Sequence, residues 1–578
     1  MKKLLVYLKN YKKECVLAPL FKMLEASFEL LVPLVIAAMI DKGIGQNDRH
    51  YIYQSCGFMI ALGIIGLICS VTAQYYAAKA AVGFSTGLRH DLFGHLLGLS
   101  YSEIDTLGTS TMITRMTSDV NQAQTGVNMF LRLFLRSPFV VFGAMIMAFT
   151  IDFRAALIFV GVILLLFLVV GLIMKFNIPM LQAVQKRLDA VLSLTRENLA
   201  GVRVIRAFCK EEEEIRRFSK QNEALAGEQR RAGWLSGALN PLTYTIVNIA
   251  IVRLIWVGAI QVDEGILTQG QVVALYNYMS QILVELIKLA NLIITINKAI
   301  ACGNRISDVF AVKSGMDEPA LSGSTPTERA ADGPAVIFRN VSLRYHNSGD
   351  EALTGIDFAV KKGETVGIIG GTGSGKTSVV NLIPRFYEVS AGEVLVNGIN
   401  VKEYPLDQLR KKVGVVMQKA VLFKGTIEEN LRWGNENASK EELEEAVGIA
   451  AAIDVVEAKG GLSSPVTQGG RNLSGGQRQR LTIARALVRK PEILILDDSA
   501  SALDFATDAK LRRAIRELSY QPTVFIVSQR ASSLQHADRI IVLEDGEMVG
   551  NGTHEQLIKS CKVYQEIYAS QFKKEALA

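Results

Sequence analysis

The chain has 578 residues, of which 49% are hydrophobic and 21% are charged, and its mean hydropathy is +0.24. These values exclude an ordinary soluble protein and also a chain that is wholly embedded in a membrane, so they predict a membrane part joined to a soluble part. The net charge of +7 fits the excess of lysine and arginine on the cytoplasmic loops of membrane proteins. We therefore expect the lipid bilayer as a partner and no nucleic acid.

The cysteines and the N-terminus add two smaller expectations. The six cysteines have no metal-like spacing and are interpreted as free thiols. The basic stretch from Met1 to Lys13 lacks a short apolar core with a cleavage site, so it is interpreted as a cytoplasmic elbow rather than a signal peptide.

Long apolar runs recur from the N-terminus to about Ile300. A helix needs about 20 largely apolar residues to cross the hydrocarbon layer. We predict six spans, at Cys15–Ile40, Ile52–Ala78, Val127–Thr150, Ala155–Met174, Ala238–Val262 and Gln271–Ile296. The long segments 79–126 and 175–237 are placed on the cytoplasmic side by the positive-inside tendency, where we expect them to continue the spans as helices joined by short helices.

Several charged residues interrupt the predicted spans. Charge at membrane depth usually faces a protein interior or an aqueous cavity. These residues therefore indicate either a polar translocation pathway or pairing between helices, and for Arg132 and Arg136 a position near the membrane boundary is the simpler interpretation. The set comprises Lys22, Glu25, Glu29, Arg132, Arg136, Arg253, Glu285 and Lys288.

The composition changes after the last span. Residues 313–334 are rich in Gly, Ser, Pro and acidic residues, which is typical of a linker. From about Ala335 to the end, short apolar strands alternate with helical segments, which is typical of an α/β domain. We therefore predict a transmembrane domain at 1–312, a linker at 313–334 and a nucleotide-binding domain at 335–578.

The strongest motif in the second half matches G-x-x-x-x-G-K-[ST], the phosphate-binding loop. It follows a predicted strand at Thr365–Ile369 and precedes a predicted helix at Ser378–Pro384. Backbone N–H groups of such a loop wrap phosphates, its lysine reaches the β- and γ-phosphates, and its threonine hydroxyl ligates Mg²⁺. The predicted ATP-binding residues here are Gly370, Gly371, Thr372, Gly373, Ser374, Gly375, Lys376, Thr377 and Ser378.

Two further motifs follow the phosphate-binding loop. The apolar run Ile493–Leu496 ends at Asp497, which is predicted to hold Mg²⁺ through water. Between the two lies Leu473-Ser474-Gly475-Gly476-Gln477, whose small residues can open a helix toward a phosphate. This LSGGQ sequence is the signature of ATP-binding-cassette (ABC) ATPases, and the chain resembles that family over nearly its whole length.

The resemblance implies a role for each motif. Ser474, Gly475, Gly476 and Gln477 would act on the ATP of a second subunit, so the working unit would be at least a dimer. Tyr345 resembles the aromatic residue that stacks on adenine, and Gln418 resembles the glutamine that meets Mg²⁺. Residues 501–504 resemble the D-loop, and residues 108–120 and 197–208 resemble the cytoplasmic coupling regions of exporters. The implied fold is an all-α six-helix transmembrane domain plus an α/β P-loop NTPase domain with an antiparallel β-subdomain.

Two catalytic positions depart from the family pattern. Asp498 stands where the family has glutamate as the general base, and its side chain is one methylene shorter. Gln529 stands where the family has the switch histidine; it can hydrogen-bond to a phosphate but cannot carry a positive charge. This pattern resembles the degenerate-site subunit of a heterodimeric exporter, whose partner supplies the glutamate and the histidine. A homodimer with two slow sites and an adequate Asp498 base are the alternatives.

The fusion of both domains in one chain resembles exporters more than importers, and it opposes a regulatory or non-transporting ABC ATPase. The resemblance implies ATP-driven export of a small molecule, with multidrug efflux as the default and a peptide, lipid or haem as rival cargo. It also implies a bacterial plasma membrane, with the N-terminus and the ATPase domain in the cytoplasm.

Overall fold

The computed structural model describes residues 2–316, 333–345 and 349–572. The residues fall into two compact units, which are Met1–Leu97 with Ser110–Val312, and Gly98–Thr109 with Lys313–Ala578. Most of the predicted linker, residues 317–332, lies outside the described residues.

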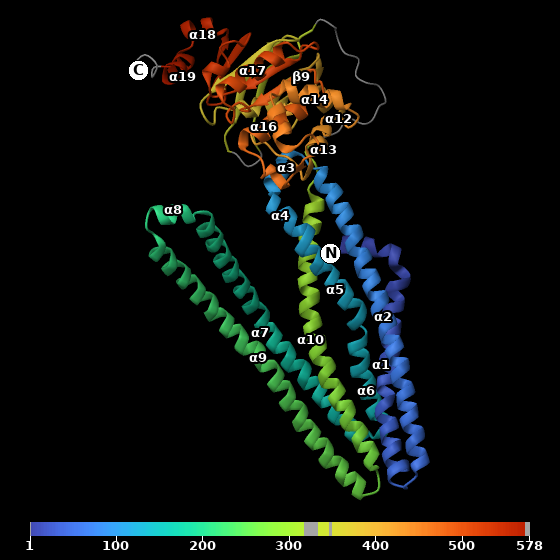
Figure 1. The fold of residues 1–578 in the computed structure, drawn as a ribbon. Coiled ribbons are helices and arrows are strands. Elements are labelled where there is room, and N and C mark those ends of the chain that lie inside the picture. The colour runs from blue at the N-terminus through green and yellow to red at the C-terminus, as the bar shows by residue number, and fades with distance from the viewer. Residues whose placement is uncertain (1, 317–332, 346–348, 573–578) are drawn as a thin grey trace. The chain divides into compact units, whose positions relative to one another are not determined.

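The first unit is entirely helical (Figure 1). Its six longest helical stretches are apolar enough to cross a membrane, which confirms the predicted number of spans. Its helical segments are η1 (Lys2–Tyr11), α1 (Lys12–Ala38), η2 (Met39–Ile44), α2 (Arg49–Leu97), α4 (Thr109–Thr114), η3 (Arg115–Asp119), α5 (Val120–Leu133), α6 (Arg136–Ile151), α7 (Phe153–Ala200), α8 (Val202–Ala207), α9 (Glu211–Asp263) and α10 (Gln269–Ala311).

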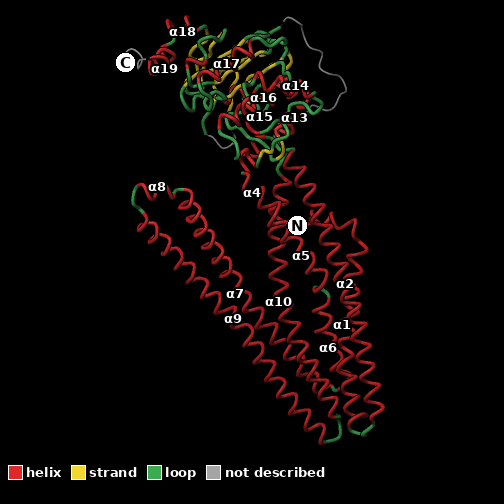
Figure 2. The backbone as a smooth tube through the Cα atoms, in the orientation of Figure 1, coloured by secondary structure: helices red, strands yellow, loops and turns green. Residues whose placement is uncertain are grey.

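Several of these helices are much longer than a membrane is thick. Helix α7 has 48 residues and α9 has 53. At about 1.5 Å per residue each is more than twice as long as the ~30 Å hydrocarbon layer. The two run side by side and are joined by the short helix α8 (Figures 1 and 2). The predicted continuation of the spans as helices is therefore present.

A buried ion-pair network joins α6 to α10 and α1. The Arg136 guanidinium, whose residue is 6% exposed, donates to Glu285 at 2.5 Å and to Glu29 at 2.6 Å. Glu285 also accepts from Ser137 at 2.9 Å and from Lys288 at 2.8 Å. For Arg136 the structure therefore shows pairing between helices, whereas its depth in a membrane stays a prediction.

The second unit holds the short helix α3 (Tyr101–Leu107) and the α/β domain. Its larger sheet has the order β12-β11-β3-β10-β9-β6, with β12 antiparallel to β11 and the other neighbours parallel. These strands are β3 (Thr365–Gly370), β6 (Val413–Val416), β9 (Ile493–Asp497), β10 (Thr523–Val527), β11 (Arg539–Glu544) and β12 (Glu547–Gly552).

An antiparallel sheet of order β2-β1-β4-β5 forms the expected β-subdomain. Its strands are β1 (Val336–Leu343), β2 (Leu353–Val360), β4 (Ala391–Val396) and β5 (Ile399–Asn400), and a small hairpin pairs β7 (Gly425–Thr426) with β8 (Pro465–Val466). The helices of this unit besides α3 are α11 (Lys376–Leu382), α12 (Leu406–Lys412), α13 (Ile427–Arg432), α14 (Lys440–Ile449), α15 (Ile453–Lys459), η4 (Gln468–Gly470), α16 (Gly475–Val488), α17 (Phe505–Arg516), η5 (Ala531–Ser533), α18 (His554–Ser560) and α19 (Lys562–Phe572).

The network around Arg136 makes a test of the helical unit. Replacing Glu285 by alanine leaves Arg136 buried without its main partner, and removing one member of a buried pair costs about 3–5 kcal/mol. We expect the purified variant to have a clearly lower melting temperature than the wild type. Glu29→Ala is the matched control, because the Glu29 side chain is 46% exposed and its loss leaves the Arg136–Glu285 pair intact. Equal shifts for the two variants would contradict this account.

Candidate functional site

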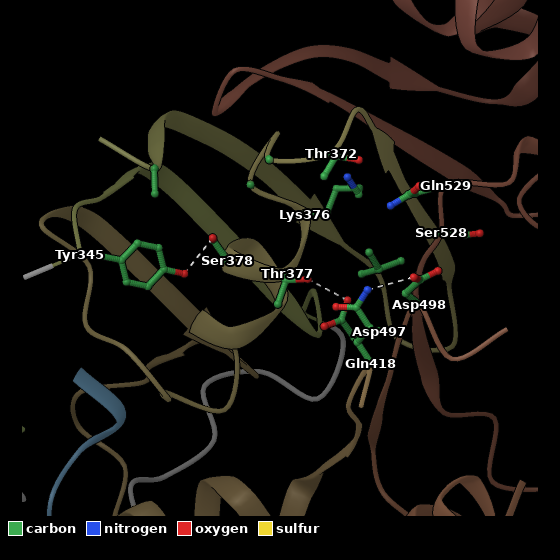
Figure 3. Close-up of a pocket in the computed structure, with 14 residues that line it drawn as sticks. Tyr345, Thr372, Lys376, Thr377, Ser378, Gln418, Asp497, Asp498, Ser528 and Gln529 are labelled. Atoms are coloured by element: carbon green, nitrogen blue, oxygen red, sulfur yellow. Dashed lines mark hydrogen bonds between the residues drawn. The ribbon is translucent and has the colours of Figure 1, made fainter. Parts of the chain in front are cut away.

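A pocket of about 290 Å³ lies where three parallel strands end. Residues of the loop that follows β3, the last residue of β9, and the last residue of β10 with the two that follow it border the pocket, because parallel strands place their carboxyl ends at one edge of the sheet. The predicted residues that line it are Tyr345, Thr372, Gly373, Gly375, Lys376, Thr377, Ser378, Gln418, Asp497, Asp498 and Gln529 (Figure 3). Residues from five separate stretches of the chain thus meet at this edge.

The loop between β3 and α11 needs glycine at its end. Gly375 has a φ of +90°, a left-handed conformation that favours glycine, and a Cβ there would lie 2.6 Å from Leu353 Cδ2. Gly370, Gly371 and Ser374 complete the loop, although they are not among the residues that line the pocket. The loop leads directly into α11, whose amino end therefore faces the pocket and favours an anion there.

Lys376 is held inside this loop. Its ammonium donates to the carbonyls of Gly370 at 3.0 Å and Gly371 at 2.5 Å, and to Ser374 Oγ at 3.3 Å. Burial lowers the pKa of Lys376 from its usual value, although the nearby Asp498 and Asp497 carboxylates oppose this. A bound phosphate would supply the counter-charge that the buried ammonium needs.

The Asp497 carboxylate at the end of β9 is joined to the phosphate-binding loop by a hydrogen bond. Thr377 Oγ1 donates to Asp497 Oδ1 at 3.0 Å, which links α11 to the end of β9. Burial raises the pKa of the Asp497 carboxyl above its usual value, and the nearby Asp498 adds to this, while Thr377 and Lys376 oppose it. Hydroxyl and carboxylate oxygens at this spacing are the ligand types that Mg²⁺ prefers.

Asp498 and Gln529 face the same pocket (Figure 3). Asp498 has a φ of +45°, a left-handed conformation in which Asp is found more often than most residues. Its Oδ2 accepts a hydrogen bond from Gln418 Nε2 at 3.1 Å. The carboxylate next to Asp497 is therefore already engaged by a neighbouring amide.

The signature residues lie elsewhere in the second unit. Ser474 caps α16, with Gln477 N donating to Ser474 Oγ at 3.3 Å and Ser474 N donating to Gln477 Oε1 at 2.9 Å. A Cβ on Gly475 would meet nothing within 4 Å, whereas a Cβ on Gly476 would lie 2.9 Å from the Ala502 carbonyl. None of these four residues is among those that line the pocket of this chain. The backbone at Gly475 is therefore open on the side where a Cβ would lie.

An aromatic cluster that sequence reasoning missed joins the pocket to α3. Tyr345 hydrogen-bonds Ser378 Oγ at 2.9 Å and packs edge-on against Tyr387, with ring centroids 5.0 Å apart. Tyr387 in turn donates to Asp105 Oδ2 of α3 at 2.7 Å, and Tyr101 of α3 stacks on Phe386 with a 4.6 Å centroid separation. No motif marked Tyr387 or Asp105, since 282 residues separate them along the chain.

This cluster can be tested with one substitution. Tyr387→Phe keeps the ring beside Tyr345 and removes only the hydrogen bond to Asp105. We expect faster amide hydrogen exchange in α3, because α3 loses its side-chain hydrogen bond to Tyr387, and an ATP affinity close to that of the wild type. Tyr345→Phe is the control that leaves Asp105 bonded. Unchanged exchange in α3 after Tyr387→Phe would show that the bond does not hold the helix.

Comparisons with known proteins agree with this geometry. A family model of the ABC transporter transmembrane region matches residues 15–286, and one of the ABC transporter matches residues 353–501. The ABC transporter ATP-binding protein YfiB of Bacillus subtilis (strain 168) is 35% identical over 576 residues, covering 100% of this chain and 99% of that protein. A lipid A-core flippase of Shigella sonnei (strain Ss046) is 28% identical over 568 residues, covering 97% of this chain and 96% of the flippase.

The fold also matches a solved structure. A bacterial Atm1-family ABC exporter with ATP bound superimposes with a TM-score of 0.80 at 23% sequence identity, covering 97% of this chain and 98% of that one. At this identity the likeness concerns the fold. Six long apolar helices followed by an ATP-binding cassette, together with full-length relatives, show that this chain belongs to the ABC transporter family, as a multi-pass half-transporter whose cassette binds ATP and hydrolyses it to drive translocation.

Proposed function

We propose that this chain is the degenerate-site half of a heterodimeric ABC exporter. The observation that carries the proposal is the pair Asp498 and Gln529, which stand in the pocket at the general-base and switch positions of the family. An aspartate carboxylate reaches about 1.5 Å less far than that of glutamate, and misplacement by about 1 Å can cost about a hundredfold in rate. The bond from Gln418 to Asp498 further reduces the ability of this carboxylate to orient water.

Glutamine in place of the switch histidine also lowers the expected rate of hydrolysis. Gln529 is neutral at every physiological pH, so it supplies no positive charge to the transition state of phosphoryl transfer. The phosphate-binding loop and Ser474 to Gln477 keep the family sequence, so binding and completion of a partner's site are retained in this proposal. The chain would bind ATP tightly, turn it over slowly, and complete the competent site of a second, non-identical half-transporter.

The finer assignments belong to the same proposal. Thr377, Gln418 and Asp497 would hold Mg²⁺ beside the β- and γ-phosphates, directly or through water, and Tyr345 would stack on the adenine ring. The transmembrane domain would be residues 1–312, the linker 313–334 and the nucleotide-binding domain 335–578. The chain would lie in a bacterial plasma membrane with its N-terminus and cassette in the cytoplasm.

The cargo is proposed as a small drug-like molecule, lipid or peptide that moves outward. The fusion of both domains in one chain supports export, and the lipid A-core flippase among the relatives keeps lipids in the set. The paired charges of the helical unit favour a structural role for Arg136 and Glu285, since both are engaged within the protein.

The first test is the ATPase activity of the purified chain alone. We expect the wild type to be nearly inactive and the double variant Asp498→Glu, Gln529→His to turn over at least tenfold faster, because it regains the base and the switch. Brisk hydrolysis by the wild type alone would contradict the proposal and favour a homodimer in which Asp498 suffices. Cross-linking between cassettes shows whether the assayed protein is dimeric.

Matched controls separate chemistry from folding in this assay. Glutamate at the left-handed position 498 introduces backbone strain, so the melting temperature of each variant must be measured beside its activity. Lys376→Ala in the double-variant background removes the phosphate contact and should return activity to background. Residual activity in that triple variant would mean that a contaminating ATPase is being measured.

A further inference from the structure

A second cavity lies in the cassette, between α17 and β10, and has a volume of about 380 Å³. This is within the range of about 300–1,000 Å³ that is usual for small-molecule sites. It is lined by Thr365, the first residue of β3, and by Val524, the second residue of β10. It is also lined by Ile526 of β10, whereas the next residue, Val527, lines the ATP pocket, so the two cavities border different stretches of the same strand.

One wall of this cavity is basic. Arg512, Arg513 and Arg516 project from the last turns of α17, and none of the described residues that line the cavity is acidic. The Arg512 guanidinium is held by two groups of the protein. It donates to the Ser533 carbonyl at 2.9 Å and pairs at 2.9 Å with Asp508, which is 3% exposed. Its guanidinium is held in place without a ligand.

The other two arginines retain donors. Arg516 is hydrogen-bonded to the His536 carbonyl, and within the described ranges no hydrogen bond or ion pair engages the guanidinium of Arg513. Asp508 pairs with Arg512, Asp538 accepts from Thr365 N at 2.8 Å, and the Glu364 carboxylate beside Thr365 pairs with Arg539 at 3.0 Å. Counted with Arg539, four guanidinium groups stand against three carboxylates, which leaves one excess positive charge, and Arg513 and Arg516 both line the cavity.

The rest of the lining is mostly aliphatic, with hydroxyl groups at its edge. Ile515, Val524 and Ile526 are buried beneath it, and Ser532 and Thr365 supply hydroxyls. A bare inorganic anion would leave this apolar wall uncovered. A ligand with an anionic group and a compact organic part would satisfy both walls.

We propose that this cavity is a second anion site, which binds a small organic phosphate with its phosphate group on Arg513 and Arg516. The planar guanidinium fork matches the oxygens of a phosphate and can bind them in pairs. The aliphatic wall takes the organic part. This site is independent of the asymmetry proposed for the ATP pocket, because it shares no residue with that pocket.

Binding is measured on the full-length chain in detergent, with the ATP pocket saturated by a non-hydrolysable ATP analogue and Mg²⁺. The probes are phenyl phosphate and inorganic phosphate, and the binding of each is measured by isothermal titration calorimetry. We expect saturable binding of phenyl phosphate and weaker binding of inorganic phosphate. The double variant Arg513→Gln, Arg516→Gln should lose about tenfold or more in affinity for phenyl phosphate, since charge-assisted hydrogen bonds are lost.

Lys510→Gln is the matched control, because Lys510 is an exposed cation on the same helix and does not line the cavity. Its affinity for phenyl phosphate should stay within about twofold of the wild type, as an exposed charge contributes little. An unchanged melting temperature and unchanged binding of the ATP analogue show that the double variant is folded. Absence of phenyl phosphate binding at millimolar concentration, or equal affinity in the double variant and the wild type, overturns the proposal.

Discussion

The site depends on a single constraint, which is that parallel strands bring their carboxyl ends to one edge of a sheet. The register pairs Ile368 of β3 with Val527 of β10, and Val527 with Asp497 of β9. The loop after β3, the carboxylates at the end of β9 and Gln529 after β10 are therefore neighbours wherever this sheet forms. The hydrogen bond from Thr377 to Asp497 then fixes the loop to the neighbouring strand end.

The same constraint explains how chemistry can be lost without loss of the fold. Asp498 and Gln529 lie just beyond the strands, so neither contributes to the buried strand core around Ile495 and Phe525. A shorter carboxylate or a neutral amide at these positions changes what the pocket can do to water and phosphate, while the sheet keeps its packing. The conformation of the signature at Ser474 is likewise independent of Asp498 and Gln529, because Ser474 and Gln477 cap α16 themselves.

Local patterns predicted the fold well and long-range partners poorly. The predicted strand at Thr365–Ile369 agrees with β3 to within one residue, since an apolar run followed by a glycine loop is a local signal. The predicted helix at Ser378–Pro384 begins two residues later than α11, because the loop lysine and threonine are already helical. The pairing of Arg136 with Glu285, 149 residues away, and the cluster around Tyr387 have no local signal, because they depend on packing between distant segments.

The membership of α3 in the second unit has a mechanical consequence. Tyr101 and Asp105 attach this helix to Phe386 and Tyr387 of the cassette, whereas the chain leaves the helical unit after Leu97 and returns to it at Ser110. The contact between α3 and the cassette is made by stacked rings and a hydrogen bond, so a movement of the cassette carries α3 with it. Because Tyr387 also packs on Tyr345, a ligand that orders the Tyr345 ring acts on the same cluster that holds α3.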